Sequence, residues 1–212
     1  MDLSLYVITD SRLFQGRSHI EIARAAIAGG ATAIQFREKG MSTRQMIDIA
    51  REIRALTLGT GVTYIVNDRV DVALGVDADG VHVGQDDMPA SLARRLIGKE
   101  RILGVSASNL EEALKAEREG ADYIGVGSIY STASKPDAGL PVGLGVLAEI
   151  ARRVSIPVIA IGGIKEENVG EVIKGGARGV AVISAVVLAP DMEEATRRLR
   201  QRIEEARGNA RQ

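Results

Sequence analysis

The run 35–39 carries polar side chains at alternate positions and reads Gln-Phe-Arg-Glu-Lys. It closes an apolar segment of β type, and alternate residues of a strand point to the same side of a sheet. Gln35, Arg37 and Lys39 are therefore expected to share one face, on which the arginine and the lysine would bind an anion. A charged strand end that is only solvated is the competing explanation.

Carboxylates follow two neighbouring apolar runs. Asn67-Asp68 ends one of them, and Gln85-Asp86-Asp87 follows the next. Magnesium prefers one or two carboxylates together with phosphate oxygens and water, so Asp68 and Asp87 are a candidate Mg2+ site. Both aspartates also precede predicted helices, where they would serve as N-caps. The residues alone leave the two readings open.

Three further segments have the composition of anion sites. Residues 127–135 read Gly-Ser-Ile-Tyr-Ser-Thr-Ala-Ser-Lys and end on Lys135, although a flexible polar loop is the alternative. The longer segment 127–143 is polar and rich in small residues, which predicts a lid. Gly162-Gly163 and Ser184 follow two later runs, where backbone amides form the usual phosphate site of a barrel. A tight strand–helix turn would also explain the paired glycines.

The chain has two histidines, His19 and His82. His19 stands at the start of a predicted helix and is expected to be exposed. His82 lies within a predicted strand, facing either the barrel interior or the helix layer. For His82, a structural role is favoured over that of a general base.

Short runs rich in Val and Ile alternate with segments of helical period, which is typical of parallel strands buried on both faces. The predicted strands are 5–9, 33–37, 63–67, 80–83, 101–105, 123–126, 158–161 and 179–183. Among the helices, Ser18 with Glu21 and Ser108 with Glu111 are predicted capping boxes.

This alternation predicts one (β/α)8 TIM barrel over residues 1–212, with 207–212 as a frayed tail. An open doubly wound sheet is the alternative. The number of units favours the barrel, as does the absence of a Gly-rich dinucleotide fingerprint after the first run. Polar residues recur instead after several runs, where a barrel gathers its active site.

Composition narrows the class of function. The net charge is −1 and aromatic residues make up 3% of the chain, so neither nucleic acid nor membrane is an expected partner. No cysteine is present, which excludes disulfides, zinc–thiolate sites and a cysteine nucleophile. The N-terminus lacks the pattern of a signal peptide, and no apolar run approaches the roughly 20 residues of a membrane span. A cytoplasmic enzyme is expected.

Eight segments, in order from residue 6 to residue 184, resemble the thiamine phosphate synthase family. They include Tyr-Val-Ile-Thr-Asp, Gln-Phe-Arg-Glu-Lys, Asn-Asp-Arg-Val-Asp-Val-Ala and Gly-Val-His-Val-Gly-Gln-Asp-Asp-Met-Pro. Gly-Val-Ser-Ala, Ala-Asp-Tyr-Ile-Gly-Val-Gly, Ala-Ile-Gly-Gly-Ile and Gly-Val-Ala-Val-Ile-Ser follow. The resemblance covers essentially the whole predicted barrel.

The resemblance implies a role for each matching residue. Those that would hold the pyrimidine pyrophosphate are Gln35, Arg37, Lys39 and Asn67. Asp68 and Asp87 would bind the Mg2+ cofactor, and Ser106 would lie near the pyrimidine. The residues with an implied catalytic role are Arg37, Lys39, Ser106 and Lys135.

The remaining implied contacts involve the second substrate. Thr132, Ser134 and Lys135 match a loop that closes over both substrates. Gly163, Ile183 and Ser184 match the thiazole-phosphate site. The family loop usually reads Pro-Ile-Phe-Pro-Thr-x-Thr-Lys, whereas this chain has serine in place of both prolines and of the second threonine. Loss of the prolines predicts a less rigid loop that keeps its hydroxyl and its lysine.

The implied reaction condenses 4-amino-2-methyl-5-hydroxymethylpyrimidine pyrophosphate with thiazole phosphate, so the partners are small molecules. A thiazole tautomerase is the nearest rival, but Ser128 stands where the resemblance puts its catalytic histidine. A phosphate-sugar barrel and a non-catalytic regulator that binds thiazole phosphate are two more distant rivals. Whether the chain forms a homo-oligomer is left open.

Overall fold

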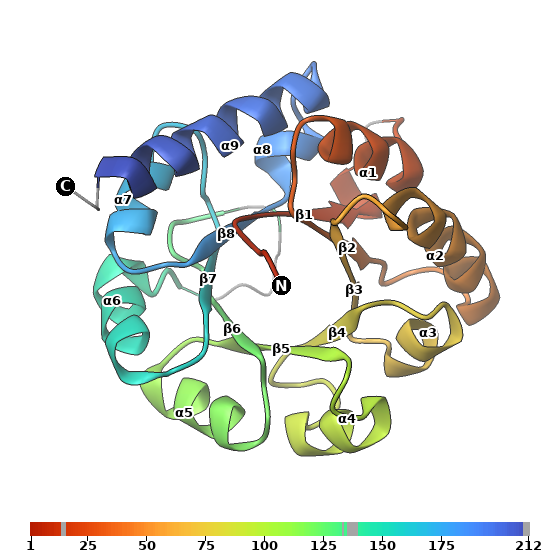
Figure 1. The fold of residues 1–212 in the computed structure, drawn as a ribbon, viewed down its shortest axis with the longest axis horizontal. Helices are drawn as coiled ribbons and strands as arrows, with labels where there is room; N and C mark the ends of the chain where they lie inside the picture. The colour runs from red at the N-terminus through yellow and green to blue at the C-terminus, as the bar shows by residue number, and fades with distance from the viewer. Residues whose placement is uncertain (14–15, 133, 135–139, 210–212) are drawn as a thin grey trace.

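Eight parallel strands close into a barrel in chain order, with helices around the outside (Figure 1). The computed structural model describes residues 1–13, 16–132, 134 and 140–209. Each strand pairs with the next, and β8 closes the ring on β1 through the pairs from Leu5–Val180 to Val7–Val182. The predicted (β/α)8 barrel is confirmed.

The strands agree with the predicted runs to within two residues at either end. Their bounds are β1 Leu5–Asp10, β2 Ala33–Arg37, β3 Thr63–Asn67, β4 Gly80–Val83, β5 Ile102–Ala107, β6 Tyr123–Val126, β7 Val158–Ile161 and β8 Gly179–Val182. Strand β5 continues past the predicted end, so that Ser106 lies within the strand. The strands are buried almost throughout, which explains why their sequences lack strict polar alternation.

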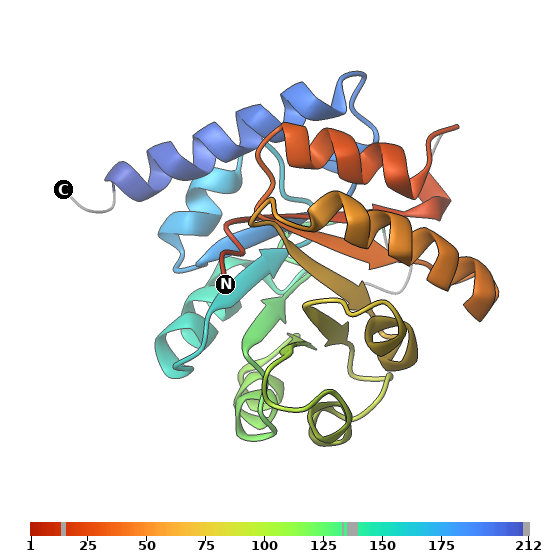
Figure 2. The ribbon, with the colours of Figure 1, turned by 45° about the vertical axis from the view of Figure 1, so that its right-hand side comes forward.

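The helices form the outer ring seen in Figures 1 and 2. Their bounds are η1 Ser11–Leu13, α1 His19–Ala28, α2 Thr43–Thr57, α3 Val70–Gly75, α4 Ala90–Ile97, α5 Leu110–Arg118, α6 Gly143–Arg153, α7 Val169–Lys174, α8 Ser184–Val187 and α9 Met192–Asn209. Helix α9 packs along α1, α7 and α8. No helix in the described part of the chain combines the length and the apolar composition needed to cross a membrane.

The helix ends confirm one capping prediction and correct two other expectations. Ser18 and Glu21 form the predicted capping box of α1. The box predicted for Ser108 is wrong: the cap is Asn109, whose side chain accepts the Glu112 amide, because β5 extends to Ala107 and shifts the start of α5. Helix α9 continues through Asn209, so residues 207–209 are helical instead of frayed, and 210–212 lie outside the described residues.

Tyr64 on β3 carries a fully buried hydroxyl that has no hydrogen-bond partner among the described residues. A buried polar group without a partner costs about 1–3 kcal/mol. Tyr64→Phe is therefore expected to leave the free energy of unfolding unchanged or to raise it by about 1 kcal/mol. Urea denaturation monitored by circular dichroism measures this change. A loss of more than about 1 kcal/mol would show that the hydroxyl is satisfied.

Candidate active site

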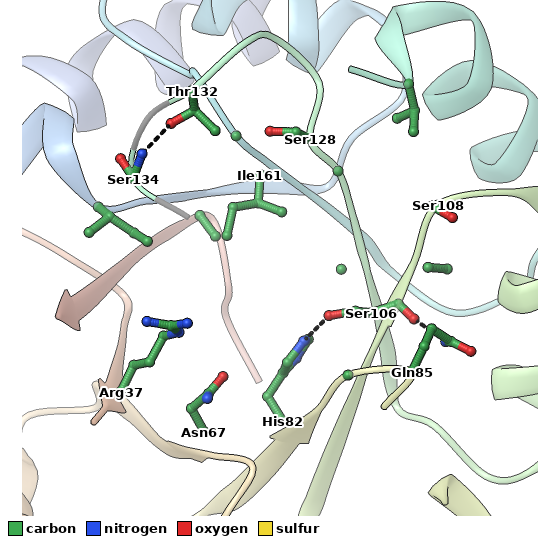
Figure 3. Close-up of a pocket in the computed structure, with 18 of the residues that line it drawn as sticks. Arg37, Asn67, His82, Gln85, Ser106, Ser108, Ser128, Thr132, Ser134 and Ile161 are labelled. Carbon is green, nitrogen blue, oxygen red and sulfur yellow. Dashed lines mark hydrogen bonds between the residues drawn. The ribbon is translucent and has the colours of Figure 1, made fainter. Parts of the chain in front are cut away.

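A cavity of about 560 Å³ opens at the carboxyl ends of the strands, where a TIM barrel places its active site (Figure 3). Most of the residues predicted to bind substrate or metal line it together. They are Arg37, Lys39, Asn67, Asp68, Asp87, Ser106, Thr132, Ser134, Gly163, Ile183 and Ser184. Lys135 lies outside the described residues, so its predicted role stays a prediction.

Gln35 is buried inside the barrel and is absent from the lining of this cavity. Its side-chain nitrogen donates a hydrogen bond of 2.8 Å to the hydroxyl of Tyr6. The alternation of the strand puts Gln35 on the same face as Arg37, but one layer deeper. Its predicted contact with the pyrimidine substrate remains a prediction.

Arg37 is held at the cavity wall by Asp10, the last residue of β1. Its guanidinium donates to the Asp10 carboxylate, and both side chains are almost fully buried. Arg12 binds the same carboxylate through two nitrogens, at 3.1 and 2.9 Å. Burial raises the pKa of Asp10, but these arginines lower it more strongly, so the net shift is downward and Asp10 stays ionised. Asp10 was not predicted from the sequence; its position at a strand end was the available signal.

Asp68 and Asp87 both line the cavity, and neither caps a helix. Arg69 and Pro89 hold the N-cap positions of α3 and α4, without a side-chain cap. Asp68 has a left-handed backbone, with φ of 60°, a conformation that aspartate tolerates better than most residues. Asp87 accepts the Gly84 amide at 2.9 Å. The N-cap explanation of these aspartates is therefore wrong.

The two carboxyl groups interact, and Lys39 pairs with one of them. Burial raises the pKa of Asp68, and the nearby Asp87 carboxyl raises it again, whereas the Lys39 ammonium lowers it; the net shift is upward. Two adjacent carboxylates repel each other when both are ionised, and a bound cation removes that repulsion. No group of three or more His, Cys, Asp or Glu suited to a metal occurs among the described residues. A pair of carboxylates fits Mg2+ that takes its other ligands from phosphate and water.

His19 is buried, contrary to the predicted exposure. Its ring bonds the Thr9 hydroxyl at 2.7 Å and the Glu38 carboxylate at 3.1 Å. Glu38 also accepts the backbone amides of Lys39 and Gly40, at 2.7 and 2.6 Å. Glu38 therefore holds the chain directly after Arg37, which orients the basic end of β2.

The same contacts make Glu38 a source of pH-dependent stability. Burial raises the pKa of Glu38, but bonds from Ser11, Gly40 and His19 lower it more strongly, to about 2. A lowered pKa in the folded state means that the stabilisation is complete above the unfolded value of about 4.3 and is lost as the pH falls towards about 2. With allowance for solvent screening, Glu38→Gln is expected to cost about 1–2 kcal/mol at neutral pH.

Chemical denaturation of both proteins between neutral pH and about pH 2.5 measures this effect. The stability difference between wild type and Glu38→Gln should shrink as the pH falls. A difference that stays constant across this range would show that the Glu38 charge does not contribute.

His82 points into the cavity, which settles the direction that its sequence left open. One ring nitrogen bonds the Ser106 hydroxyl at 2.8 Å (Figure 3). The second ring nitrogen bonds the Tyr123 hydroxyl at 2.9 Å. His82 also lines the cavity and is a site residue that the sequence did not predict. Its place in a strand between two apolar neighbours concealed this role.

The first residues after β6 dock on the turn after β7. The amides of Ile129 and Tyr130 donate to the carbonyls of Ile161 and Gly162, at 2.8 and 3.0 Å. Gly163 has φ of 66°, and a Cβ there would lie 2.7 Å from the Cβ of Tyr130. Glycine at 163 is therefore required by the backbone and by the loop it touches. Residue 133 and residues 135–139 of the predicted lid lie outside the described residues.

Figure 3 shows Arg37, Asn67 and His82 on one side of the cavity, and Ser128, Thr132 and Ser134 on the opposite side. Basic and acidic side chains lie on the β2–β4 side, the paired glycines Gly162 and Gly163 follow β7, and Ile183 and Ser184 follow β8. The fold and the cavity at the carboxyl ends of the strands place the protein among the TIM-barrel enzymes.

The family model described as thiamine monophosphate synthase matches residues 5–186. The chain is 61% identical over 200 residues to the thiamine-phosphate synthase of Chloroflexus aurantiacus, covering 94% of this chain and 92% of that protein. It is 54% identical over 204 residues to the thiamine-phosphate synthase of Moorella thermoacetica, covering 96% and 97%. The solved thiamine phosphate pyrophosphorylase from Pyrococcus furiosus superposes with a TM-score of 0.89 at 50% identity, covering 96% of each chain.

The chain belongs to the thiamine monophosphate synthase family. It is a transferase of thiamine biosynthesis with a TIM-barrel fold.

Proposed function

We propose that this chain condenses 4-amino-2-methyl-5-hydroxymethylpyrimidine pyrophosphate with thiazole phosphate, giving thiamine phosphate and pyrophosphate. The observation that carries the proposal is the meeting of Arg37, Lys39 and the Asp68–Asp87 pair at one cavity wall. Two cations beside two carboxylates form a site for a magnesium-bound pyrophosphate. The 50–61% identity to proteins named for this activity supports the assignment.

Asp68 and Asp87 would hold the Mg2+ ion. Bound there, the ion supplies positive charge that stabilises the pyrophosphate as it departs. Arg37 is fixed by Asp10, so it offers a donor that needs no reorganisation during the reaction. Lys39 is about half exposed, which leaves its ammonium able to exchange the Asp68 carboxylate for a phosphate oxygen.

The reaction exchanges one bond at the pyrimidine methylene carbon for another. The carbon–oxygen bond breaks, and its electron pair leaves with the pyrophosphate. The aminopyrimidine ring delocalises the positive charge that develops on the carbon, and the thiazole nitrogen then donates its lone pair to form the carbon–nitrogen bond. Arg37, Lys39 and Lys135 stabilise the leaving charge, and no nucleophilic side chain is required.

Thiazole phosphate would bind at the turns after β7 and β8. Gly163 and Ser184 line the cavity there, and the short helix α8 begins at Ser184. Backbone amides at these turns form the phosphate site of many TIM barrels. Thr132 and Ser134 line the cavity from the loop after β6 and would contact the substrates from that side.

A turnover assay with both substrates tests the proposal. The purified protein should release thiamine phosphate and pyrophosphate in equal amounts, detected by mass, and a chelator should abolish both. Isomerisation of a thiazole without the pyrimidine would identify a tautomerase instead. Binding of thiazole phosphate without any product would identify a non-catalytic regulator.

A further inference from the structure

A hydrogen-bond network crosses the barrel interior from β2 to β5. Gln35 donates to the Tyr6 hydroxyl at 2.8 Å, and the hydroxyls of Tyr6 and Tyr123 lie 3.1 Å apart. The Tyr123 hydroxyl bonds Nδ1 of His82 at 2.9 Å, and Nε2 of His82 bonds the Ser106 hydroxyl at 2.8 Å. The hydrogen-bond network thus joins the buried Gln35 to a serine that lines the cavity.

Two glycines make room for the contact between Tyr123 and His82 in the middle of this hydrogen-bond network. A Cβ at Gly104 would collide with the Tyr123 hydroxyl and would lie 2.5 Å from Nδ1 of His82. A Cβ at Gly125 would lie 3.0 Å from the His82 ring. Since any side chain at Gly104 would separate these groups, strands β5 and β6 are shaped around the contact between Tyr123 and His82.

The hydrogen-bond donors determine the direction in which each bond of this network runs. Gln35 occupies the Tyr6 oxygen as an acceptor, so the Tyr6 hydrogen points to Tyr123, its second partner among the described residues. Both tyrosines are 1% exposed, and a buried hydroxyl hydrogen must find an acceptor. The Tyr123 hydrogen then points to Nδ1 of His82, which leaves the imidazole proton on Nε2 to be donated to Ser106.

We propose that Tyr123 is a positioning residue that acts through His82 to fix the Ser106 hydroxyl as a hydrogen-bond donor toward the pyrimidine ring. This inference rests on the proposed function and on the position near the pyrimidine that the family resemblance implies for Ser106. Because Nε2–H of His82 occupies a lone pair of the serine oxygen, the serine hydrogen is available to a ring nitrogen of the substrate. A chain of oriented hydrogen bonds also polarises its members, which strengthens that final donor.

Tyr123→Phe removes the Tyr123 hydroxyl from the hydrogen-bond network and keeps the aromatic ring that packs edge-on against Tyr6. The variant should lower kcat/KM for the pyrimidine pyrophosphate about tenfold, the size of one oriented hydrogen bond. The KM for thiazole phosphate should be unchanged. The matched control is Tyr64→Phe, which removes a buried hydroxyl that does not belong to the hydrogen-bond network. This control should change neither kcat/KM for the pyrimidine pyrophosphate nor KM for thiazole phosphate.

Nitrogen NMR of isotope-labelled histidine provides a readout that a merely structural role would not move. His82 should carry its proton on Nε2 in the wild-type protein and become a mixture of tautomers in Tyr123→Phe. The signal is assigned by its loss in His82→Gln, because His19 is the only other histidine. If Tyr123→Phe does not fold, Tyr6→Phe removes the neighbouring hydroxyl of the hydrogen-bond network. This variant should shift the same His82 signal and lower the same kcat/KM for the pyrimidine pyrophosphate.

The inference is overturned if wild-type His82 carries its proton on Nδ1 or on both nitrogens, or if Tyr123→Phe matches Tyr64→Phe in kinetics. Either result with normal wild-type turnover removes only this inference. Absence of wild-type turnover would remove the proposed function and with it the role of Tyr123 in binding substrate.

Discussion

Asp87→Asn is expected to lower turnover about 100-fold at low magnesium, with partial recovery when Mg2+ is in excess. Asparagine keeps an oxygen that can accept the Gly84 amide, so the local fold should persist. It removes one of the two charges that attract the cation, so the loss should appear mainly as weaker magnesium binding. Initial rates at a series of Mg2+ concentrations measure the effect.

Asp71→Asn is the control for this measurement. Asp71 is an exposed carboxylate on α3 that pairs with Arg69 and does not line the cavity. Its substitution should change neither turnover nor magnesium dependence. Full activity of Asp87→Asn at low magnesium would show that Asp87 is not a metal ligand.

Arg37→Met is expected to lower kcat about 100- to 1000-fold, because it removes a preorganised donor from the departing pyrophosphate. It should also destabilise the fold by up to about 3 kcal/mol, because Asp10 stays buried with Arg12 as its remaining arginine. Arg37→Lys keeps the charge but loses the planar fork, so an intermediate kcat is expected. Steady-state rates at saturating substrates and thermal unfolding measure the two effects separately.

Arg54→Met is the control variant that separates the effect of losing an ion pair from the effect of losing an active-site arginine. Arg54 on α2 pairs with Asp79 at 3.0 Å, away from the cavity. Its substitution should alter kcat by no more than about twofold, whatever it does to stability. Equal losses of kcat in Arg54→Met and Arg37→Met would mean that destabilisation alone explains both.

The sequence predicted the barrel well because its signals are local. Buried parallel strands read as continuous apolar runs, and glycines mark the turns between units. The clustering of Arg37, Asp68 and Ser184 followed from the same pattern, since the carboxyl ends of all strands meet at one face of a barrel.

Features that depend on contacts between distant segments were not predictable in this way. His19 is buried because Thr9 and Glu38, from two separate segments of the chain, supply its hydrogen bonds. The alternation of β2 placed Gln35 on the correct face but not at the correct depth. A step of two residues is about 6–7 Å along a strand, which puts Gln35 within reach of Tyr6 and below the cavity.

The choice between N-cap and metal ligand for Asp68 and Asp87 also needed three-dimensional information. Both explanations require an aspartate before a helix, so composition and spacing cannot separate them. The observed caps at Arg69 and Pro89 exclude the first explanation.

A crystal structure with Mg2+ and pyrophosphate bound tests the central claim most directly. The account predicts the metal between the carboxylates of Asp68 and Asp87, with pyrophosphate oxygens bound by Arg37 and by Lys39. Lys39 should then have left its contact with Asp68. Pyrophosphate bound only at the turns after β7 and β8, with no metal at the two aspartates, would contradict the account.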